Sequence, residues 1–485
     1  MSTEIKAGGS ITSGIFWKVL ENGGTQGVQF LVSIVLARLV APEEYTSVAL
    51  ITIFIAIANV LIQNSFNTAL IQNRDVTAVD YSSVFYLNLL TAGILYLLLY
   101  VTAPFIAAFY RIPELSPMLR VLAVTLFFGA AISVQNAIVA RTMNFKKLCI
   151  ASFVTAVLSG VVGISMAYGG YGVWALVAQQ FLNSLLLMLT LGILVAWHPI
   201  LCFSMERIKV LFSFGWKLLC SGFIDTIYTN VYGLVIGKIY NPAMLAYYNR
   251  GNQFPLLIAN NLGGAIQSVM LPAYSMNQDD RAKIKQMVKR TIVTASFVMF
   301  PLMAGMMAVA EPMIRLMLTE RWMPVVPFLR LLCISYALWP IHVANLQAMN
   351  ALGRSDQYLK LEIIKKVLGI ISLIATMPFG VYAMVLVKTL MEFVCFFINA
   401  YPNRKLLNYS FWEQCRDIMP AALASAVMGI LVYGIGTQIE SAALALAVQI
   451  LCGIILYAGI GWVTHMTGMQ EIRMVLRKLH AGSVS

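Results

Sequence analysis

The residues best suited to bind a solute follow one face of each of two segments, 11–40 and 208–240. In the first segment polar side chains recur at steps of four, three, four and four, at Lys18, Asn22, Thr25, Gln29 and Ser33. The second segment carries a similar series, at Lys217, Ser221, Asp225, Tyr228 and Tyr232. Such steps place side chains on one face of an α-helix. Since amides and hydroxyls form hydrogen bonds and lysines attract anions, both faces predict binding of a polar, anionic group.

Two further segments, 44–72 and 243–275, carry polar residues at helical spacing. These residues are Asn59, Gln63 and Asn67 in the first, and Asn249, Gln253 and Asn260 in the second. Polar groups that face lipid are costly, so they face either other helices or water. For a single Asn or Gln, a hydrogen bond between helices is the more common role. Because four such stripes occupy matching positions, we expect them to line a hydrated central cavity.

Basic residues in these segments suggest what the cavity binds. We expect five of them to form cationic linings at its two mouths, namely Lys18, Arg38, Lys217, Lys238 and Arg250. Each could instead extend to the lipid headgroups. A polar cavity with basic mouths suits an amphipathic anion such as a sugar on a lipid diphosphate, because Arg and Lys bind phosphate oxygens.

Two acidic residues lie in the same segments. Glu21 stands three residues after Lys18 and could pair with it. Asp225 lies near the middle of its segment, where an acid is expensive inside a membrane. The sequence leaves two roles open for it, pairing with a cavity cation or coupling transport to an ion.

The composition shows which elements must position these residues. The chain has 485 residues, of which 60% are hydrophobic and 11% charged, against about 25% charged in a typical soluble domain. It is therefore predicted to be an all-α integral membrane protein of about fourteen transmembrane helices. The expected helices span residues 11–40, 44–72, 79–103, 116–141, 146–168, 171–197, 208–240, 243–275, 286–310, 324–351, 356–377, 380–401, 414–437 and 441–468.

The distribution of the 33 Lys and Arg residues predicts the orientation. If the N-terminus is cytoplasmic, the outer connections contain only Arg111, Arg315 and Arg321, as the positive-inside rule requires. Both termini are then cytoplasmic, and the net charge of +13 reflects topology and not nucleic-acid binding. The outer loops are short, which disfavours a membrane enzyme, since acid–base chemistry usually needs convergent carboxylates on a sizeable loop.

An internal repeat organises the chain. Trp17-Lys18 recurs at Trp216-Lys217, and GGYGVWALV (169–177) is echoed by PFGVYAMVL (378–386). Six helices per copy make the repeats parallel, an arrangement typical of alternating-access transporters. We expect a cytoplasmic N-terminus (1–10), an N-lobe (11–197), a linker (198–207), a C-lobe (208–401), a second linker (402–413), two further helices (414–468) and a cytoplasmic tail (469–485).

Other polar residues predict structure only. His342 and Glu392 are expected to form hydrogen bonds between helices and not a metal site, because no second ligand stands three or four residues away. Gly233 and Gly237 form a GxxxG motif typical of close helix packing. We expect no cofactor, no metal and no catalytic residue.

Several stretches together resemble a known family. They are ARLVAPEEYTSVALI (37–51), ARTMNFKKL (140–148), GGYGVWALV (169–177), FGWKLLCSGFIDTIYTNVYGLVIGKIYNP (214–242), YYNRGNQFP (247–255) and VMLPAYSMNQDDRAKI (269–284). The sequence resembles the polysaccharide transport branch of the multidrug, oligosaccharidyl-lipid and polysaccharide exporter superfamily, and within it the exporters of colanic acid and teichuronic acid type.

The resemblance implies a function. It implies flipping of undecaprenyl-diphosphate-linked oligosaccharide units across the bacterial inner membrane by a rocking mechanism without ATP. The expected partners are the lipid-linked substrate, membrane lipid, and polymerase or chain-length proteins. Three alternatives are a multidrug/cation antiporter of the same superfamily, which the basic mouths disfavour, a flippase for a lipid-linked peptidoglycan precursor, and an integral-membrane polysaccharide polymerase.

Overall fold

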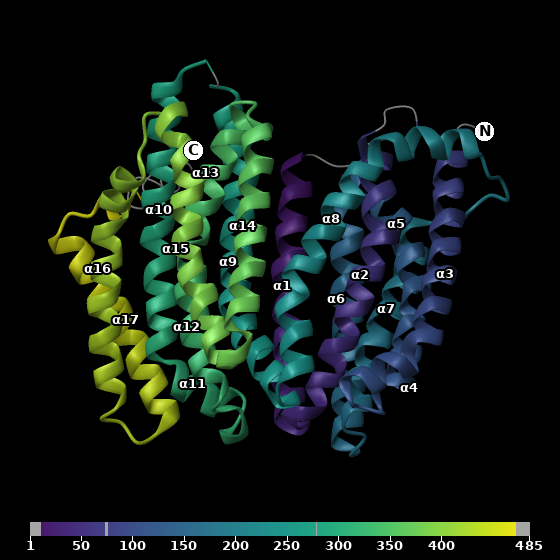
Figure 1. The fold of residues 1–485 in the computed structure, drawn as a ribbon, viewed down its shortest axis with the longest axis horizontal. Coiled ribbons are helices and arrows are strands. Elements are labelled where there is room, and N and C mark those ends of the chain that lie inside the picture. The colour runs from purple at the N-terminus through teal and green to yellow at the C-terminus, as the bar shows by residue number, and fades with distance from the viewer. Residues whose placement is uncertain (1–10, 73–75, 278, 472–485) are drawn as a thin grey trace. The chain divides into compact units, whose positions relative to one another are not determined.

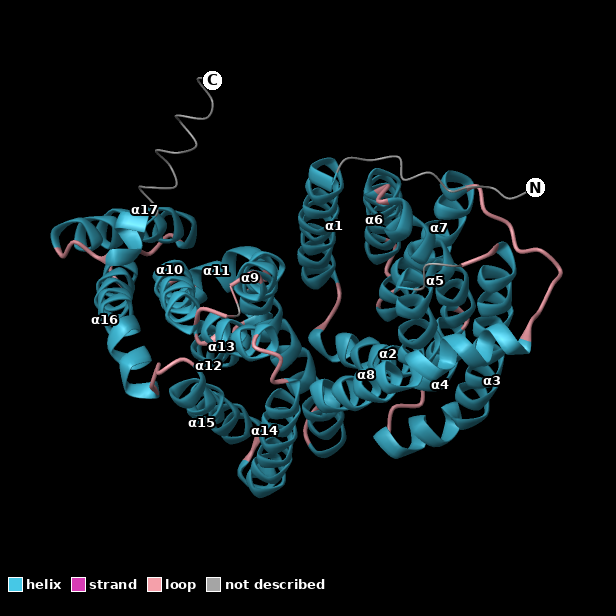
Figure 2. Ribbon diagram, turned by 90° about the horizontal axis from the view of Figure 1, so that it is seen from above, coloured by secondary structure: helices cyan, strands magenta, loops and turns pink. Residues whose placement is uncertain are grey.

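The computed structural model describes residues 11–72, 76–277 and 279–471. Within these ranges, the side chains of some helix residues, including Lys18, Asn22 and Lys217, lie outside the description. The secondary structure of the described ranges consists of helices, with no strand among them (Figure 2). The predicted all-α class is therefore confirmed.

The chain divides into two compact units, Met1–Ala246 and Tyr247–Ser485. The helices of the first unit are labelled in Figure 1. They are α1 (Ile11–Leu39), α2 (Pro42–Gln72), α3 (Ala78–Tyr110), α4 (Leu115–Ala123), α5 (Thr125–Thr142), α6 (Phe145–Tyr168), α7 (Val173–Val195) and α8 (Met205–Ile239).

The second unit contains most of α9 and the helices that follow it. These helices are α9 (Pro242–Ser275), α10 (Arg281–Ala308), α11 (Ala310–Met317), α12 (Val325–Ala337), α13 (Trp339–Ala351), α14 (Ser355–Thr376), α15 (Val381–Leu406), α16 (Phe411–Gly436) and α17 (Ala442–Val463). Short 3₁₀ turns, η1 (Glu320–Trp322) and η2 (Met377–Phe379), precede α12 and α15.

The predicted segments are helical, but two that were expected to be single helices are each a pair. The segment 116–141 is interrupted at Val124, between α4 and α5, and the segment 324–351 is interrupted at Leu338, between α12 and α13. The second break has a local cause, because Pro340 stands in the first turn of α13, where its missing N–H costs nothing.

Eleven spans in the described residues are long and apolar enough to cross a membrane, and α4–α5 and α12–α13 each count as one of them. Helices α1, α9 and α14 are not among the eleven. The protein is thus a multi-pass membrane protein, and the total of fourteen crossings remains a prediction.

Matching connections support the internal repeat. Two residues separate α1 from α2 and two separate α8 from α9, and Pro42 and Pro242 open the second helix of each pair, a position that suits the fixed φ of proline. The helices α7 and α15 are preceded by Gly172 (φ 52°) and Gly380 (φ 95°), in backbone conformations that favour glycine.

Helix α8 packs closely along α2. A Cβ on Gly233 would lie 2.9 Å from Cδ1 of Ile53, and one on Gly237 would lie 2.8 Å from Cδ2 of Leu50. The GxxxG motif therefore serves as the predicted packing seam, since small residues let backbones approach closely. This contact places α8 in the first compact unit, and the expected division into lobes at 198–207 remains a prediction.

Candidate functional site

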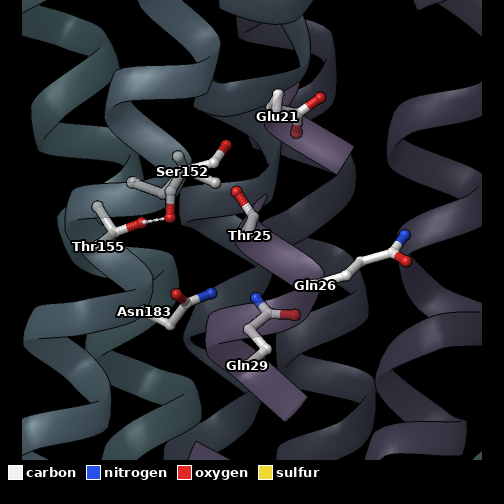
Figure 3. Close-up of a pocket in the computed structure, with 8 residues that line it drawn as sticks. Glu21, Thr25, Gln26, Gln29, Ser152, Thr155 and Asn183 are labelled. Carbon is white, nitrogen blue, oxygen red and sulfur yellow. Dashed lines mark hydrogen bonds between the residues drawn. The ribbon is translucent and has the colours of Figure 1, made fainter. Parts of the chain in front are cut away.

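A polar pocket opens between α1, α6 and α7 of the first unit (Figure 3). Its volume is about 240 Å³. The residues that line it are Glu21, Thr25, Gln26, Gln29, Ser152, Thr155, Asn183 and Leu187. Seven of these eight side chains are polar, although the three helices are otherwise rich in apolar residues.

Small residues on α6 allow the three helices to meet. A Cβ on Gly160 would collide with Val32 of α1, and one on Gly163 would lie 2.7 Å from Cβ of Gln179 on α7. Both glycines therefore permit the close approach that brings the polar residues of α1 and α7 to opposite walls of the pocket.

Hydrogen bonds fix part of the lining. The Thr155 hydroxyl donates to the Ser152 carbonyl at 3.1 Å, and the Ser159 hydroxyl lies 3.4 Å from Oδ1 of Asn183 across the contact of α6 and α7. Figure 3 shows the Gln29 and Asn183 amides turned toward each other, whereas Gln26 extends away. The Thr25 hydroxyl is buried and has no hydrogen-bond partner in the protein.

The lining favours recognition of neutral polar groups. Its amides and hydroxyls can both donate and accept hydrogen bonds, and Glu21 can accept them. Its described residues include no Lys or Arg, and the described part of the chain contains no group of three potential metal ligands. The arrangement can therefore hold a polyhydroxylated group.

Of the predicted site residues on α1, the structure brings Glu21 and Gln29 together in this pocket. Arg38 is exposed in the last turn of the helix. Lys18 and Asn22, like Lys217 of α8, have side chains outside the described residues, so their predicted roles remain predictions.

The remaining predicted cations each contact neighbouring groups. Lys238 donates to the carbonyl oxygen of Phe109, and its Nζ lies 3.8 Å from the centre of that ring. This contact helps to complete the C-terminal end of α3, where helix carbonyls lack intrahelical partners. In the second unit Arg250 is only 7% exposed, and it donates to Oε1 of Gln253 at 2.7 Å.

The predicted polar stripe on α2 contacts α5. Asn59 and Gln63 are joined by a hydrogen bond of 3.2 Å, and both lie against Gly129, where a Cβ would be 2.8 Å from Oδ1 of Asn59. One turn further along, the Oδ1 of Asn67 is buried without a hydrogen-bond partner. The first two residues thus bond to each other within α2 and pack against the backbone of α5 at Gly129.

Polar residues on α8 and α9 are more open. Asp225 is exposed near the middle of α8, and Asn260 is exposed near the middle of α9, whereas Asn249 is half-buried. Exposed polar groups at mid-helix favour a water-filled environment over lipid.

Several polar residues of the pocket could not be predicted from the polar face of α1. Ser152, Thr155 and Asn183 of the pocket were not predicted, although the spacing of Ser152, Thr155 and Ser159 places them on one face of α6. In the second unit the predicted hydrogen bonding of His342 is confirmed, because its Nδ1 lies 3.0 Å from the Asn399 amide of α15.

Comparison of the sequence with known proteins shows which family the chain resembles. A model of the family described as polysaccharide biosynthesis protein matches residues 35–327. The chain is 26% identical to the teichuronic acid biosynthesis protein TuaB of Bacillus subtilis, over 82% of this chain and 84% of TuaB. It is 26% identical to the succinoglycan biosynthesis transport protein ExoT of Rhizobium meliloti, over 67% of this chain and 66% of ExoT.

A third relative is similar in sequence, and two solved structures are similar in fold. The lipopolysaccharide biosynthesis protein WzxC of Escherichia coli is 22% identical over 87% of this chain and 88% of WzxC. The lipid II flippase MurJ, in an inward closed conformation, is similar with a TM-score of 0.77 and 14% identity, covering 93% of this chain and 99% of MurJ.

A multidrug resistance MATE family transporter of the MOP superfamily, in its inward-facing conformation, is similar with a TM-score of 0.58 and 16% identity, covering 83% of this chain and 96% of that chain. These two likenesses concern the fold. Because the family model covers more than half of the chain, the resemblance predicted from the sequence is confirmed, and this protein belongs to the polysaccharide biosynthesis protein family.

Proposed function

We propose that this protein flips undecaprenyl-diphosphate-linked oligosaccharide units from the cytoplasmic to the outer leaflet of the bacterial inner membrane, for the synthesis of a surface polysaccharide. The observation that carries the proposal is the polar pocket midway along α1, in a protein whose relative ExoT is named a transport protein. A polar pocket inside an apolar helix bundle is expensive unless it binds a polar solute or water.

The mechanism we propose is alternating access. Exposed polar residues in the middle of α8 and α9, such as Asp225 and Asn260, support a hydrated pathway for the polar head of the substrate. The lipid tail meanwhile stays in the bilayer. Such movement needs no bond to be made or broken, so the protein is proposed to act as a transporter and not as an enzyme.

The cationic residues are proposed to bind the diphosphate during transport. Arg38 and Lys238 are exposed at helix ends, which supports this role, whereas Arg250 would have to leave its contact with Gln253. Lys18 and Lys217 retain the role that the sequence predicts. The polar residues of α1, α2 and α9 would then contact the sugars, and Asp225 would pair with a cation or couple an ion.

The orientation also remains a proposal. Both termini are proposed to be cytoplasmic because the expected outer connections are poor in Lys and Arg. Cysteine-accessibility labelling of intact cells at residue 4 and at residue 483 tests this topology. Labelling by a membrane-impermeant reagent only after the membrane is broken is expected, and labelling in intact cells would contradict it.

Transport itself can be tested in reconstituted vesicles. The full-length protein is placed in liposomes with a fluorescent, short-chain prenyl diphosphate that carries an oligosaccharide, and the fraction of label reached by an impermeant quencher is followed in time. Faster equilibration across the bilayer than in protein-free liposomes is expected. An equal rate in both would contradict the proposed function.

A further inference from the structure

We propose that the pocket between α1, α6 and α7 is a sugar-binding subsite, which holds one sugar ring of the lipid-linked substrate and selects among sugars. This inference rests on the proposed function and assigns a role to the lining residues of the first unit. Three properties of the pocket lead to it, namely its size, its hydrogen-bonding groups and its charge.

The size matches one ring and not an oligosaccharide. The volume of the pocket is about 240 Å³. Sites for larger organic ligands are about 300–1,000 Å³. A single pyranose ring with its hydroxyls fits this space, and the remaining sugars of a repeat unit would lie outside it.

The hydrogen-bonding groups match a ring of hydroxyls. Each sugar hydroxyl both donates and accepts, and so do the amides of Gln29 and Asn183, which Figure 3 shows turned toward the same space. The Thr25 hydroxyl is buried without a partner. An unsatisfied buried group is costly, and a ligand hydroxyl at this place would remove the cost.

The charge of the lining separates the sugar from the diphosphate. Among the described residues that line the pocket there is no Lys or Arg, and Glu21 adds a carboxylate. Sugar hydroxyls can donate strong hydrogen bonds to this carboxylate. The described lining therefore suits the sugar, and we assign the diphosphate to the basic residues named under the proposed function.

Thr25→Val gives the sharpest test, because valine has nearly the shape of threonine and lacks the hydroxyl. The Thr25 hydroxyl has no partner in the protein, so its loss is not expected to lower the thermal stability. Asn183→Leu removes an amide that α7 contributes to the pocket. Gln180→Leu on the same helix α7 is the matched control, since Gln180 is bonded to Thr52 and does not line the pocket.

The measurement is the affinity of the full-length protein, in lipid nanodiscs, for two fluorescent probes. One is undecaprenyl diphosphate with a single hexose, tested with glucose, galactose and N-acetylglucosamine, and the other is undecaprenyl diphosphate without sugar. Thr25→Val and Asn183→Leu should each weaken binding of the preferred sugar-bearing probe about tenfold, the effect of about 1.4 kcal/mol. Binding of the sugar-free probe should change less than twofold, and Gln180→Leu should match the unsubstituted protein with both probes.

Three outcomes would overturn the inference. Unchanged affinity for every sugar-bearing probe in both variants would remove the pocket from recognition while leaving the proposed function intact. An equal loss for both probes would show that the pocket acts on the diphosphate or on the fold. No binding of any probe by the unsubstituted protein would contradict both the subsite and the proposed function.

Discussion

The Nε2 of His342 on α13 lies 3.4 Å from the Oε2 of Glu392 on α15. The other ring nitrogen of His342 lies 3.0 Å from the amide of Asn399, so one imidazole bridges two residues of the neighbouring helix. The sequence predicts hydrogen bonds between helices for both residues. The bond of His342 with Asn399 confirms this for the histidine, whereas its Nε2 only contacts Glu392 and makes no hydrogen bond. This contact joins two helices of the second unit, and the charges of Lys388 and Lys365 also lie near Glu392.

Glu392→Ala is expected to destabilise the protein by about 1 kcal/mol, the usual scale for polar contacts between membrane helices. The substitution removes the carboxylate, so the Nε2 of His342 loses its contact with Glu392. A shift of the thermal unfolding midpoint in detergent measures the effect. Glu362→Ala is the control, because Glu362 pairs with Lys365 one turn away on its own helix. Equal shifts for the two variants would contradict a specific role for the pair.

Arg38→Ala and Lys238→Ala are expected to lower transport about tenfold or more while leaving the protein in the membrane. A hydrogen bond to a charged group contributes about 1.5–3 kcal/mol, which corresponds to such a factor. Arg250→Ala should act similarly if the contact with Gln253 opens during transport. Complementation of a flippase-deficient strain, with membrane abundance measured in parallel, checks the effect.

A second substitution at Lys238 separates the effect of its charge from an effect on the fold. Since it also binds the Phe109 carbonyl, Lys238→Ala could weaken the fold, and Lys238→Arg keeps the charge. The arginine variant should retain most of the transport. Full complementation by the three alanine variants and by their combination would contradict a role of these cations in transport.

Gly172→Ala is expected to destabilise the protein more than Gly380→Ala. Both glycines have positive φ, where a side chain costs about 1–2 kcal/mol. A Cβ on Gly172 would also lie 2.5 Å from Oε1 of Glu44, whereas nothing lies within 4 Å of one on Gly380. Thermal unfolding of both variants separates backbone strain from the collision. Equal midpoints would show that Glu44 moves aside at no cost.

Asp225→Asn distinguishes the two roles proposed for this acid. If Asp225 couples transport to an ion, the variant should lose the dependence of transport on imposed sodium, proton or voltage gradients. If it pairs with a cation, the dependence should remain while the rate falls. Vesicle transport under each gradient in turn is the measurement, and an unchanged gradient dependence removes Asp225 as the coupling residue.

Much of the fold could be predicted because the ends of the apolar runs are marked by charge, Pro and Gly. The expected segment 11–40 became Ile11–Leu39, and 44–72 became Pro42–Gln72. The break at Val124 has no such mark, since it lies in a continuous apolar run. The break at Leu338 could have been predicted from Pro340.

The candidate site was only partly predictable for a different reason. Helical spacing identified the polar face of α1, and Thr25 and Gln29 of that face do line the pocket. Asn183 lies near Gln179, Gln180 and Ser184 in α7, and the packing against α6 sets which of these polar side chains lines the pocket. That packing depends on Gly160 and Gly163, whose role is set by contacts between helices and not by local sequence.

Movement of a sugar linked to a lipid diphosphate across the bilayer is the function proposed for this protein. The most direct measurement is the rate at which a fluorescent prenyl-diphosphate oligosaccharide equilibrates between the leaflets of liposomes that contain the purified protein. We expect a rate well above that of protein-free liposomes, and a lower rate with Arg38→Ala. Equal rates with and without the protein would contradict it.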